Sequence, residues 1–521
     1  MADVHVEAAR KAVQPRQFGE IGAQDVQRTG RRGSAAGQRE GSAHAAHRAH
    51  ASKLFPVVTT PRDAMLSPLA GPYRMGAIGR HGAGARDDTG FREVLMAGAA
   101  SPVRGLDGQG LPGSVGDRRR EISLTSSTSA PPRVWLDAPR RREREGVGVA
   151  RYAAVLAQTL ETLGAPPAFV RDAAPSDARA QNRLAAWLRA QRAGVRRLRP
   201  AGDDQTWTRR DLFAEAQSYF NRHGRLMELT VPDPPTVMHW TYPVPLAMTG
   251  TRNLYTIHDL IPLQRPDLTG VDPRRHRRLL EAVATRADHL VAVSEHTRRA
   301  LIEILGASPH RVTNTWQASP DAERNSPAEW PPLPPGLVEK GYFVAVGAID
   351  PRKNLTRLAA AWRAAGAPLP LVIVGPDGWR AETVLKGLPS DPRLIRLPWL
   401  ERRALLALIA RARALLFPSL AEGFGLPALE AMHLGAPVLA SAEDGLAEVV
   451  GDGGLLVAPE DEAALAAAIG RLAGDDRLRE TLIRAGSKRA LAFSHHAYGR
   501  RLAALYQAVA DQSLAPLHDA G

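Results

Sequence analysis

The chain has 521 residues, a formal net charge of +14 and no cysteine. This length allows two or three domains with buried cores, and the lack of cysteine excludes disulfides, thiolate metal sites and cysteine nucleophiles. No apolar run approaches the roughly 20 residues of a transmembrane helix, and the first residues lack the apolar core of a secretory signal. We therefore expect a cytoplasmic protein.

Residues 1–130 differ in composition from the rest of the chain. They are rich in Gly, Ala, Arg, His and Ser and show no sustained periodicity of helix or strand. They carry 18 Lys and Arg against 12 Asp and Glu, a net of +6, which leaves +8 for the remainder. Nucleic-acid binding is one interpretation of this charge, although the aromatic residues that stack on single strands are scarce here. We expect this segment to be low-complexity and disordered.

Residues 131–318 are predicted to form a first α/β domain. The strand pattern RVWL at 133–136 is followed by a glycine-rich turn that contains Gly148 and then by a helical pattern. Such a turn is where α/β sheets bind phosphate-bearing ligands, and a plain tight turn is the alternative interpretation. The short apolar runs VMHW, NLYTI and HLVAVS, separated by helical patterns, predict a mainly parallel sheet that is covered on both faces.

His258 directly follows the strand NLYTI, at the edge of the sheet where ligands bind. In one interpretation, His258 and Asp259 only shape a turn. In the other, the imidazole of His258 forms a hydrogen bond with a sugar hydroxyl.

Residues 183–199 combine arginines with apolar residues at helical spacing. Basic amphipathic helices can lie on anionic lipid. Alternatively, the apolar stripe belongs to the core and the arginines form a solvated face. The apolar residues are Leu184, Trp187, Leu188, Val195 and Leu198.

The prolines of residues 319–338 predict an interdomain linker. A second α/β domain is predicted at 339–494, and a final amphipathic helix at 495–515 is expected to cross back to the first domain. Arg352 and Lys353 lie in the turn after the first strand of this second domain, YFVAVG. Cations beside helix amides can hold a diphosphate, whereas solvated loop charges are the alternative.

The stretch FPSLAEGFGLPALEAMHLGAPVLAS at 417–441 reads as a strand, a glycine turn, a helix and a second strand. Glu422 lies in the turn and Glu430 in the following helix. Backbone amides at such a helix start favour anions, and glycines let a phosphate or a sugar approach the main chain. Two carboxylates beside an anion site indicate chemistry on a phosphorylated ligand that is rich in hydroxyls.

This stretch resembles the donor-site signature of the retaining glycosyltransferases of family 4, in which two glutamates are separated by seven residues. Other segments agree with that family in the same order along residues 133–510. They are GVARY, TIHDLIPL, VAVSEHTRRAL, VGAIDPRKNL, LVIVG and LAEVVGDGGLLVAPED. The PRKN segment is most similar to the branch of mannosyl- and related transferases of bacterial surface polysaccharides.

The resemblance implies the GT-B fold, in which two Rossmann-like domains face a cleft. It assigns Glu422 and His258 to the reacting sugar or acceptor, and Glu430 to the ribose of the nucleotide. The residues that it assigns to donor binding are Arg352, Lys353, Glu430, Gly423, Phe424, Gly425 and Gly148.

The function implied by the resemblance is a retaining transfer of a hexose, with mannose as the guess, from GDP-mannose or a similar nucleotide sugar. The acceptor is expected to be a glycan or a lipid-linked glycan of a surface polysaccharide such as lipopolysaccharide. Peripheral contact with an anionic membrane at its inner face is expected, and no cofactor and no catalytic metal. The alternatives are a sugar phosphorylase or epimerase on the same fold, or a basic nucleic-acid-binding protein.

Overall fold

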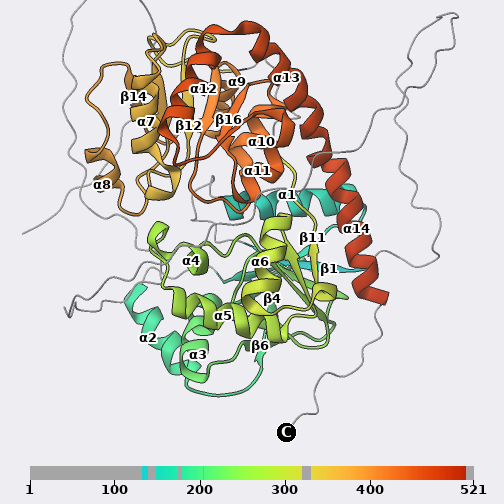
Figure 1. Cartoon of the computed structure of the whole chain (residues 1–521). Coiled ribbons are helices and arrows are strands. Elements are labelled where there is room, and N and C mark those ends of the chain that lie inside the picture. Colours follow the sequence, from blue (N-terminus) through green and yellow to red (C-terminus); the bar gives the residue numbers. More distant parts are fainter. Residues whose placement is uncertain (1–131, 139–147, 174–178, 203–204, 320–329, 512–521) are drawn as a thin grey trace, which may run out of the picture. The chain divides into compact units, whose positions relative to one another are not determined.

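The structure is a computed structural model that describes residues 132–138, 148–173, 179–202, 205–319 and 330–511. The disorder expected for residues 1–130 lies outside these ranges, and so does the middle of the predicted linker. Two large parallel sheets with helices on their faces make up most of the described chain (Figure 1).

The first sheet has eight strands in the order β11-β10-β9-β7-β1-β2-β5-β4, and only β4 runs antiparallel to its neighbour. Its central strands β1, β7 and β9 are buried along their whole length, because helices cover both faces of the sheet. The strands are β1 (Val134–Asp137), β2 (Ala168–Asp172), β4 (Arg199–Pro200), β5 (Thr206–Arg209), β7 (Val237–Trp240), β9 (Arg252–Ile257), β10 (His289–Ala292) and β11 (Val312–Asn314).

Two helices of this part of the chain, α5 and α6, begin at residues whose side chains accept a hydrogen bond from the first turn. The Ser294 side chain accepts a hydrogen bond from the amide of Thr297, and Gly306 ends the same helix in a left-handed conformation. The elements are α1 (Gly148–Thr162), α4 (Ile261–Gln264), η1 (Pro266–Leu268), α5 (Pro273–Arg286), α6 (Glu295–Leu305) and η2 (Pro309–Arg311).

A small parallel sheet, in the order β3-β6-β8, lies beside a pair of packed helices. Its middle strand β6 contributes Met227 and Leu229 to the core, and both are completely buried. These elements are α2 (Arg179–Ala190), β3 (Arg196–Arg197), α3 (Leu212–His223), β6 (Met227–Thr230) and β8 (Leu246–Met248).

The second large sheet is entirely parallel, in the order β14-β13-β12-β15-β16-β17. Counted from its own first strand, this is the order 3-2-1-4-5-6 of a doubly wound Rossmann sheet. The strand order reverses between β12 and β15, and ligands bind at the carboxyl ends of the strands at that point. The strands are β12 (Phe343–Val346), β13 (Leu371–Val374), β14 (Leu394–Leu397), β15 (Ala414–Phe417), β16 (Val438–Ser441) and β17 (Leu455–Val457).

Helices cover both faces of this second sheet as well (Figure 1). Its core includes Trp362, which is 1% exposed and whose indole N–H donates to the carbonyl of Leu369. The elements are η4 (Pro351–Lys353), α7 (Leu355–Ala364), α8 (Ala381–Lys386), α9 (Arg402–Ala410), α10 (Leu426–His433), α11 (Asp444–Val450), η5 (Gly451–Gly453), α12 (Glu462–Gly474), α13 (Asp476–Ala490) and η6 (Leu491–Phe493).

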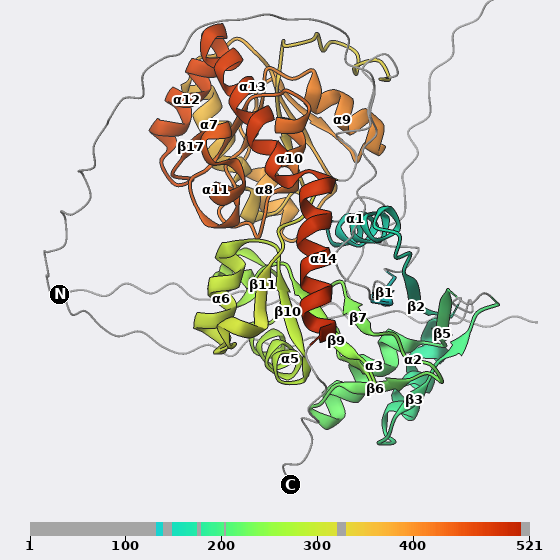
Figure 2. The same cartoon turned by 90° about the vertical axis from the view of Figure 1, so that its right-hand side faces the viewer.

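The last helix, α14 (His495–Asp511), packs against α1 of the first sheet. Figure 2 shows it in red beside α1 in teal. The hydroxyl of Tyr506 on α14 lies 2.7 Å from Nδ1 of His239 on β7, and both side chains are buried. The predicted α/β class with two Rossmann-like parallel sheets is therefore confirmed. No helix among the described residues has the length and apolar character to cross a membrane.

Candidate functional site

The strand order of the second sheet places two loops next to each other. One follows β12 and leads through Asp350 into η4, and the other follows β15 and contains Glu422. Asn354, which is buried at the end of η4, fastens these loops together. Its side-chain Nδ2 donates to the carbonyls of Pro418 at 3.1 Å and Pro459 at 2.7 Å. The sequence motif PRKN contained this asparagine, but its spacing alone gave it no role.

Glu422 forms ion pairs with both cations predicted to bind the diphosphate. Its Oε1 lies 2.6 Å from Nζ of Lys353 and 2.8 Å from Nη1 of Arg352, and all three side chains are mostly buried. Burial by itself would raise the pKa of Glu422. The charges of Arg352 and Lys353 outweigh this effect and hold the pKa at about 2. Glu422 is therefore an ionised carboxylate at neutral pH.

The side chain of Lys353 lies against Phe417 and Gly347. Its Nζ lies 4.5 Å from the centre of the Phe417 ring, a cation–π contact. A Cβ on Gly347, which has φ of +144°, would come within 2.7 Å of Cε of Lys353, so this position requires glycine. Burial lowers the pKa of Lys353, and the charge of Glu422 opposes that shift. Lys353 also borders a small pocket that Gly347, Leu416 and Phe417 help to line.

Glu430 lies on α10 and its side chain is completely buried between arginines from two parts of the chain. Arg402 at the start of α9 binds both carboxylate oxygens, with distances of 2.7 Å and 3.1 Å. Arg151 on α1 contacts Oε1 at 3.2 Å. A buried carboxylate is stable only when its charge is paired in this way. Oε1 accepts from both arginines and Oε2 from Arg402 alone, so one lone pair of Oε2 is left for a ligand hydroxyl.

The glycine turn after β15 allows the main chain of the second sheet to touch the first. A Cβ on Gly423 would overlap the carbonyl oxygen of His258 and lie 3.0 Å from Cβ of Asp259. Gly425, at φ +97°, begins α10 in a conformation that favours glycine. The side chain of Phe424 packs edge-on against Phe493 at 5.7 Å, so it belongs to the core.

His258 lies at the end of β9, and its Nε2 is 2.9 Å from the carbonyl oxygen of Thr241. Because a carbonyl can only accept, Nε2 carries the proton and Nδ1 is the acceptor of the neutral ring. Burial lowers the pKa of His258, which favours this neutral form. The ring also stands edge-on to Tyr152, with centroids 4.9 Å apart.

Asp137, at the end of β1, supports the same region and was not recognised as a site residue from the sequence. Its Oδ1 accepts a hydrogen bond of 2.5 Å from the amide of Thr241, whose carbonyl holds His258. Its Oδ2 is buried and accepts no hydrogen bond from the described residues. Burial raises the pKa of Asp137 to about 7.

Gly148 is the first residue of α1, one turn before Arg151. A Cβ added there would meet no described atom within 4 Å. The structure thus joins Arg352 and Lys353 directly to Glu422, links α1 to Glu430 through Arg151, and places Gly423 against the backbone of His258. It gives no direct contact between Gly148 and the other predicted site residues.

Comparisons with known proteins agree on one family. Residues 147–314 match the description Glycosyltransferase Family 4, and residues 335–489 match Glycosyl transferases group 1. The O-antigen chain mannosyltransferase B of Escherichia coli is 32% identical over 254 residues, which are 47% of this chain and 67% of that relative. The chain belongs to glycosyltransferase family 4.

Two further similar proteins match this glycosyltransferase over different fractions of their length. The serotype-specific mannosyltransferase WbdA of Escherichia coli is 30% identical over 212 residues, which cover 36% of this chain and only 26% of WbdA. The structure of sucrose-phosphate synthase from Thermosynechococcus elongatus is 20% identical with a TM-score of 0.52, covering 73% of this chain and 99% of that chain. That likeness concerns the fold, and the predicted GT-B architecture is confirmed.

Sequence reasoning also missed Glu448 on α11, which connects the two halves of the glycosyltransferase. Its carboxylate accepts hydrogen bonds from the backbone amides of Glu295, at 2.9 Å and 2.8 Å, and of His296, at 3.1 Å, the first residues of α6. The indole N–H of Trp316 also donates to it, and Asn314 Nδ2 lies 3.4 Å away. An anion at a helix N-terminus is stabilised by the unpaired amides and the helix dipole. The segment LAEVVGDGG contains Glu448, but the partners of this residue lie more than 130 residues away in the sequence.

Proposed function

We propose that this glycosyltransferase moves a hexose from a nucleotide sugar to a glycan or lipid-linked acceptor and retains the anomeric configuration. The observation that carries the proposal is the ion-paired cluster of Glu422, Arg352 and Lys353 at the reversal point of the second sheet. Phosphate-bearing ligands bind at this position in doubly wound sheets. Mannose from GDP-mannose is the first candidate donor, since two relatives are named as mannosyltransferases.

The leaving group of the proposed reaction is a nucleoside diphosphate. Arg352 and Lys353 bring two positive charges and Glu422 one negative charge, which leaves +1 for the three groups. As the bond to the sugar breaks, negative charge grows on the diphosphate and its attraction to the two cations increases. Pre-organised charges that act on a developing anion are a large source of catalysis. No atom of the described residues lies within 4 Å of a Cβ built on Gly148, so the phosphates would approach the first sheet there.

Glu422 is assigned to positioning and charge stabilisation of the donor sugar rather than to covalent catalysis. A carboxylate whose pKa is held at about 2 by two cations is a weak base and a weak nucleophile. Retention would then arise from attack by the acceptor hydroxyl on the same face of the sugar as the departing diphosphate, which would take the proton of that hydroxyl as its bond to the sugar breaks. Nδ1 of His258 is assigned to accept a hydrogen bond from a hydroxyl of the donor sugar or of the glycan that receives the hexose.

Glu430 is assigned to the ribose of the donor, which the remaining lone pair of Oε2 would bind. Arg402 and Arg151 hold the carboxylate in one orientation for that contact. We also propose that the reaction uses no cofactor and no catalytic metal. The protein would work in the cytoplasm at the inner face of the membrane, where a lipid-linked acceptor is reached.

The test uses the full-length chain with a panel of nucleotide sugars, and nuclear magnetic resonance to assign the anomeric configuration of the product. Lys353→Ala should lower kcat by about 10²–10³-fold, as the loss of one stabilising charge does. Glu430→Gln should mainly raise the donor KM, because it keeps the shape of a side chain that two arginines surround. Lys386→Ala, at an exposed lysine of α8, is the matched control. Wild-type transfer by both site variants, or an inverted product, would refute the proposal.

A further inference from the structure

Helix α2 is packed with its small residues inward and its large apolar residues outward. Ala186 and Ala190 are completely buried, whereas Leu184, Trp187 and Leu188 are 59%, 51% and 54% exposed. A surface helix of a globular protein normally buries its large apolar side chains. The interpretation of this stripe as core is therefore wrong for these three residues.

The three exposed side chains form one surface, because residues at positions i, i+3 and i+4 lie on the same face of a helix. Val195, in the loop after α2, is 48% exposed, whereas Leu198 is 1% exposed and does belong to the core. Single exposed apolar residues need no explanation, but a contiguous group that includes a tryptophan marks an interaction site. We call Leu184, Trp187 and Leu188 the α2 face.

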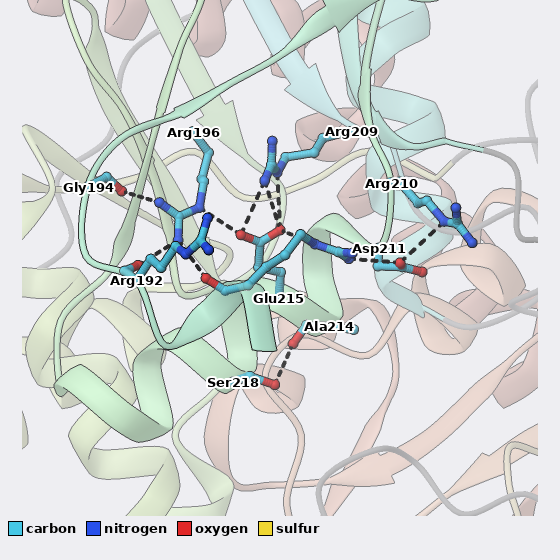
Figure 3. Close-up of polar contacts among 10 residues, drawn as sticks. Arg192, Gly194, Arg196, Arg209, Arg210, Asp211, Ala214, Glu215 and Ser218 are labelled. Atoms are coloured by element: carbon cyan, nitrogen blue, oxygen red, sulfur yellow. Dashed lines mark hydrogen bonds and ion pairs between the residues drawn. The ribbon is translucent and has the colours of Figure 1, made fainter. Parts of the chain in front are cut away.

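A buried carboxylate fixes α2 in this orientation. Glu215 on α3 has no exposed side-chain surface and pairs with three arginines, Arg189 on α2, Arg196 on β3 and Arg209 on β5, at 3.2 Å, 2.7 Å and 3.1 Å (Figure 3). These contacts tie α2 and β3 to α3. The α2 face is thus held outward by a buried ionic cluster.

Arg196 also closes the carboxyl end of α2. Its guanidinium donates to the carbonyls of Arg189, Arg192 and Gly194 at 3.0 Å, 2.7 Å and 2.9 Å (Figure 3). A cation at this end satisfies the last carbonyls of the helix and opposes its dipole. The loop that carries Val195 is therefore set against the end of the helix.

The segment that carries the α2 face contains positive charges only. Residues 179–200 contain seven arginines and no Asp or Glu. Arg189 and Arg196 contact Glu215, but Arg192, Arg197 and Arg199 are exposed. An apolar helical face that includes tryptophan and is bordered by arginines fits the boundary between the headgroups and acyl chains of an anionic lipid layer.

We propose that the α2 face docks this glycosyltransferase on an anionic lipid surface. Trp187 and Leu188 would enter the headgroup region, and Arg192, Arg197 and Arg199 would contact lipid phosphates. A second copy of the chain fits less well, because a two-fold contact would bring the same arginines together. Nucleic acid fits less well, because one tryptophan among aliphatic side chains offers no run of stacking surfaces. Only one part of this inference rests on the proposed function, namely that docking would bring the site to a lipid-linked acceptor.

The experiment measures sedimentation of the full-length chain with vesicles of phosphatidylcholine alone or mixed with phosphatidylglycerol, at low and high salt. The wild-type chain should bind the anionic vesicles at low salt. The partition coefficient of the double variant Trp187→Ser with Leu188→Ser should fall at least about tenfold, since the variant removes two apolar side chains from the lipid. Each of Arg192→Gln and Arg197→Gln should reduce binding about fivefold.

Leu491→Ser is the matched control, because Leu491 is 66% exposed but lies in the second half of the chain, and it should bind like wild type. Turnover of a soluble nucleotide sugar should be unchanged in the double variant, which separates docking from the proposed chemistry. Equal binding of wild type and double variant, or no binding to anionic vesicles, would overturn the proposal. Two other results would also overturn it. One is a dimer in sedimentation velocity that the double variant abolishes, and the other is RNA binding without vesicle binding that the double variant abolishes.

Discussion

Replacing Glu448 by alanine should loosen the attachment of the second sheet to the first. The Glu448 carboxylate on α11 accepts hydrogen bonds from the amides of Glu295 and His296 and from the indole of Trp316. The first two donors begin α6, and Trp316 lies in the segment after β11. In the variant these donors have no carboxylate to bind. They lie at the interface where Gly423 approaches the carbonyl of His258. The loss therefore falls on the attachment of the two halves rather than on either core.

The magnitude follows from the hydrogen bonds that the alanine variant cannot form. A hydrogen bond to a charged group contributes about 1.5–3 kcal/mol, and an anion at a partly buried helix N-terminus contributes up to about 2 kcal/mol. These two effects overlap, so we expect a net loss of about 2–4 kcal/mol, or about 30-fold to 1000-fold in the docking equilibrium. Glu448→Gln keeps an acceptor oxygen but not the charge, and should lose about half of that free energy.

The assay is donor KM together with the urea-unfolding midpoint of the full-length chain. Glu448→Ala should raise the KM for the nucleotide sugar at least about tenfold, because the residues proposed to bind it come from both halves, and should lower the midpoint. Glu443→Ala is the control, since this exposed acid also lies at α11 and its side chain caps no helix amide. If Glu448→Ala matches Glu443→Ala in both measurements, the carboxylate does not hold the two halves together.

Three further predictions concern the residues that support the site. Gly423→Ala should impair donor binding and stability, because its Cβ would overlap the carbonyl of His258, whereas Gly148→Ala should leave the unfolding midpoint unchanged and weaken only donor binding in calorimetry. Burial raises the pKa of Asp137 to about 7, so the native chain holds a proton that the unfolded chain releases above about pH 4. Stability should therefore fall between about pH 4 and 7, by at most about 1.4 kcal/mol per pH unit, and urea titrations of Asp137→Asn should lack this slope. Tyr506→Phe leaves a buried imidazole nitrogen without its partner and should cost about 1–3 kcal/mol in unfolding free energy, with an unchanged midpoint as the contrary result.

The parallel sheets could be predicted because their strands are continuous apolar runs. LVIV of β13 and VLAS of β16 are buried on both faces, and that pattern is typical of a covered parallel sheet. The small sheet could not be predicted in the same way. Its strand β3 has only two residues, Arg196 and Arg197, and the contact of the Arg196 side chain with Glu215 cannot be read from any periodicity.

The part of the candidate site that lies in loops after strands of one sheet could be predicted from the sequence. Glu422 and Lys353 follow strands of one sheet, so their approach could be expected from the strand order alone. The partners of Glu430 could not, because Arg151 is 279 positions away and Arg402 lies in a helix without a recognised motif. Long-range pairs of this kind depend on how the two sheets meet.

The excess of basic residues has a structural explanation in part. Three buried carboxylates are each matched by more than one cation: Glu215 by three arginines, Glu430 by two, and Glu422 by an arginine and a lysine. A carboxylate in a low-dielectric interior needs several donors to fill its lone pairs, and the planar guanidinium supplies them in pairs. Two of these seven cations also pair with Asp211 and Asp350, so the seven face five acids and contribute +2 to the formal charge. A positive balance that arises in this way does not indicate nucleic-acid binding, whereas the exposed arginines around the α2 face remain available to an anionic surface.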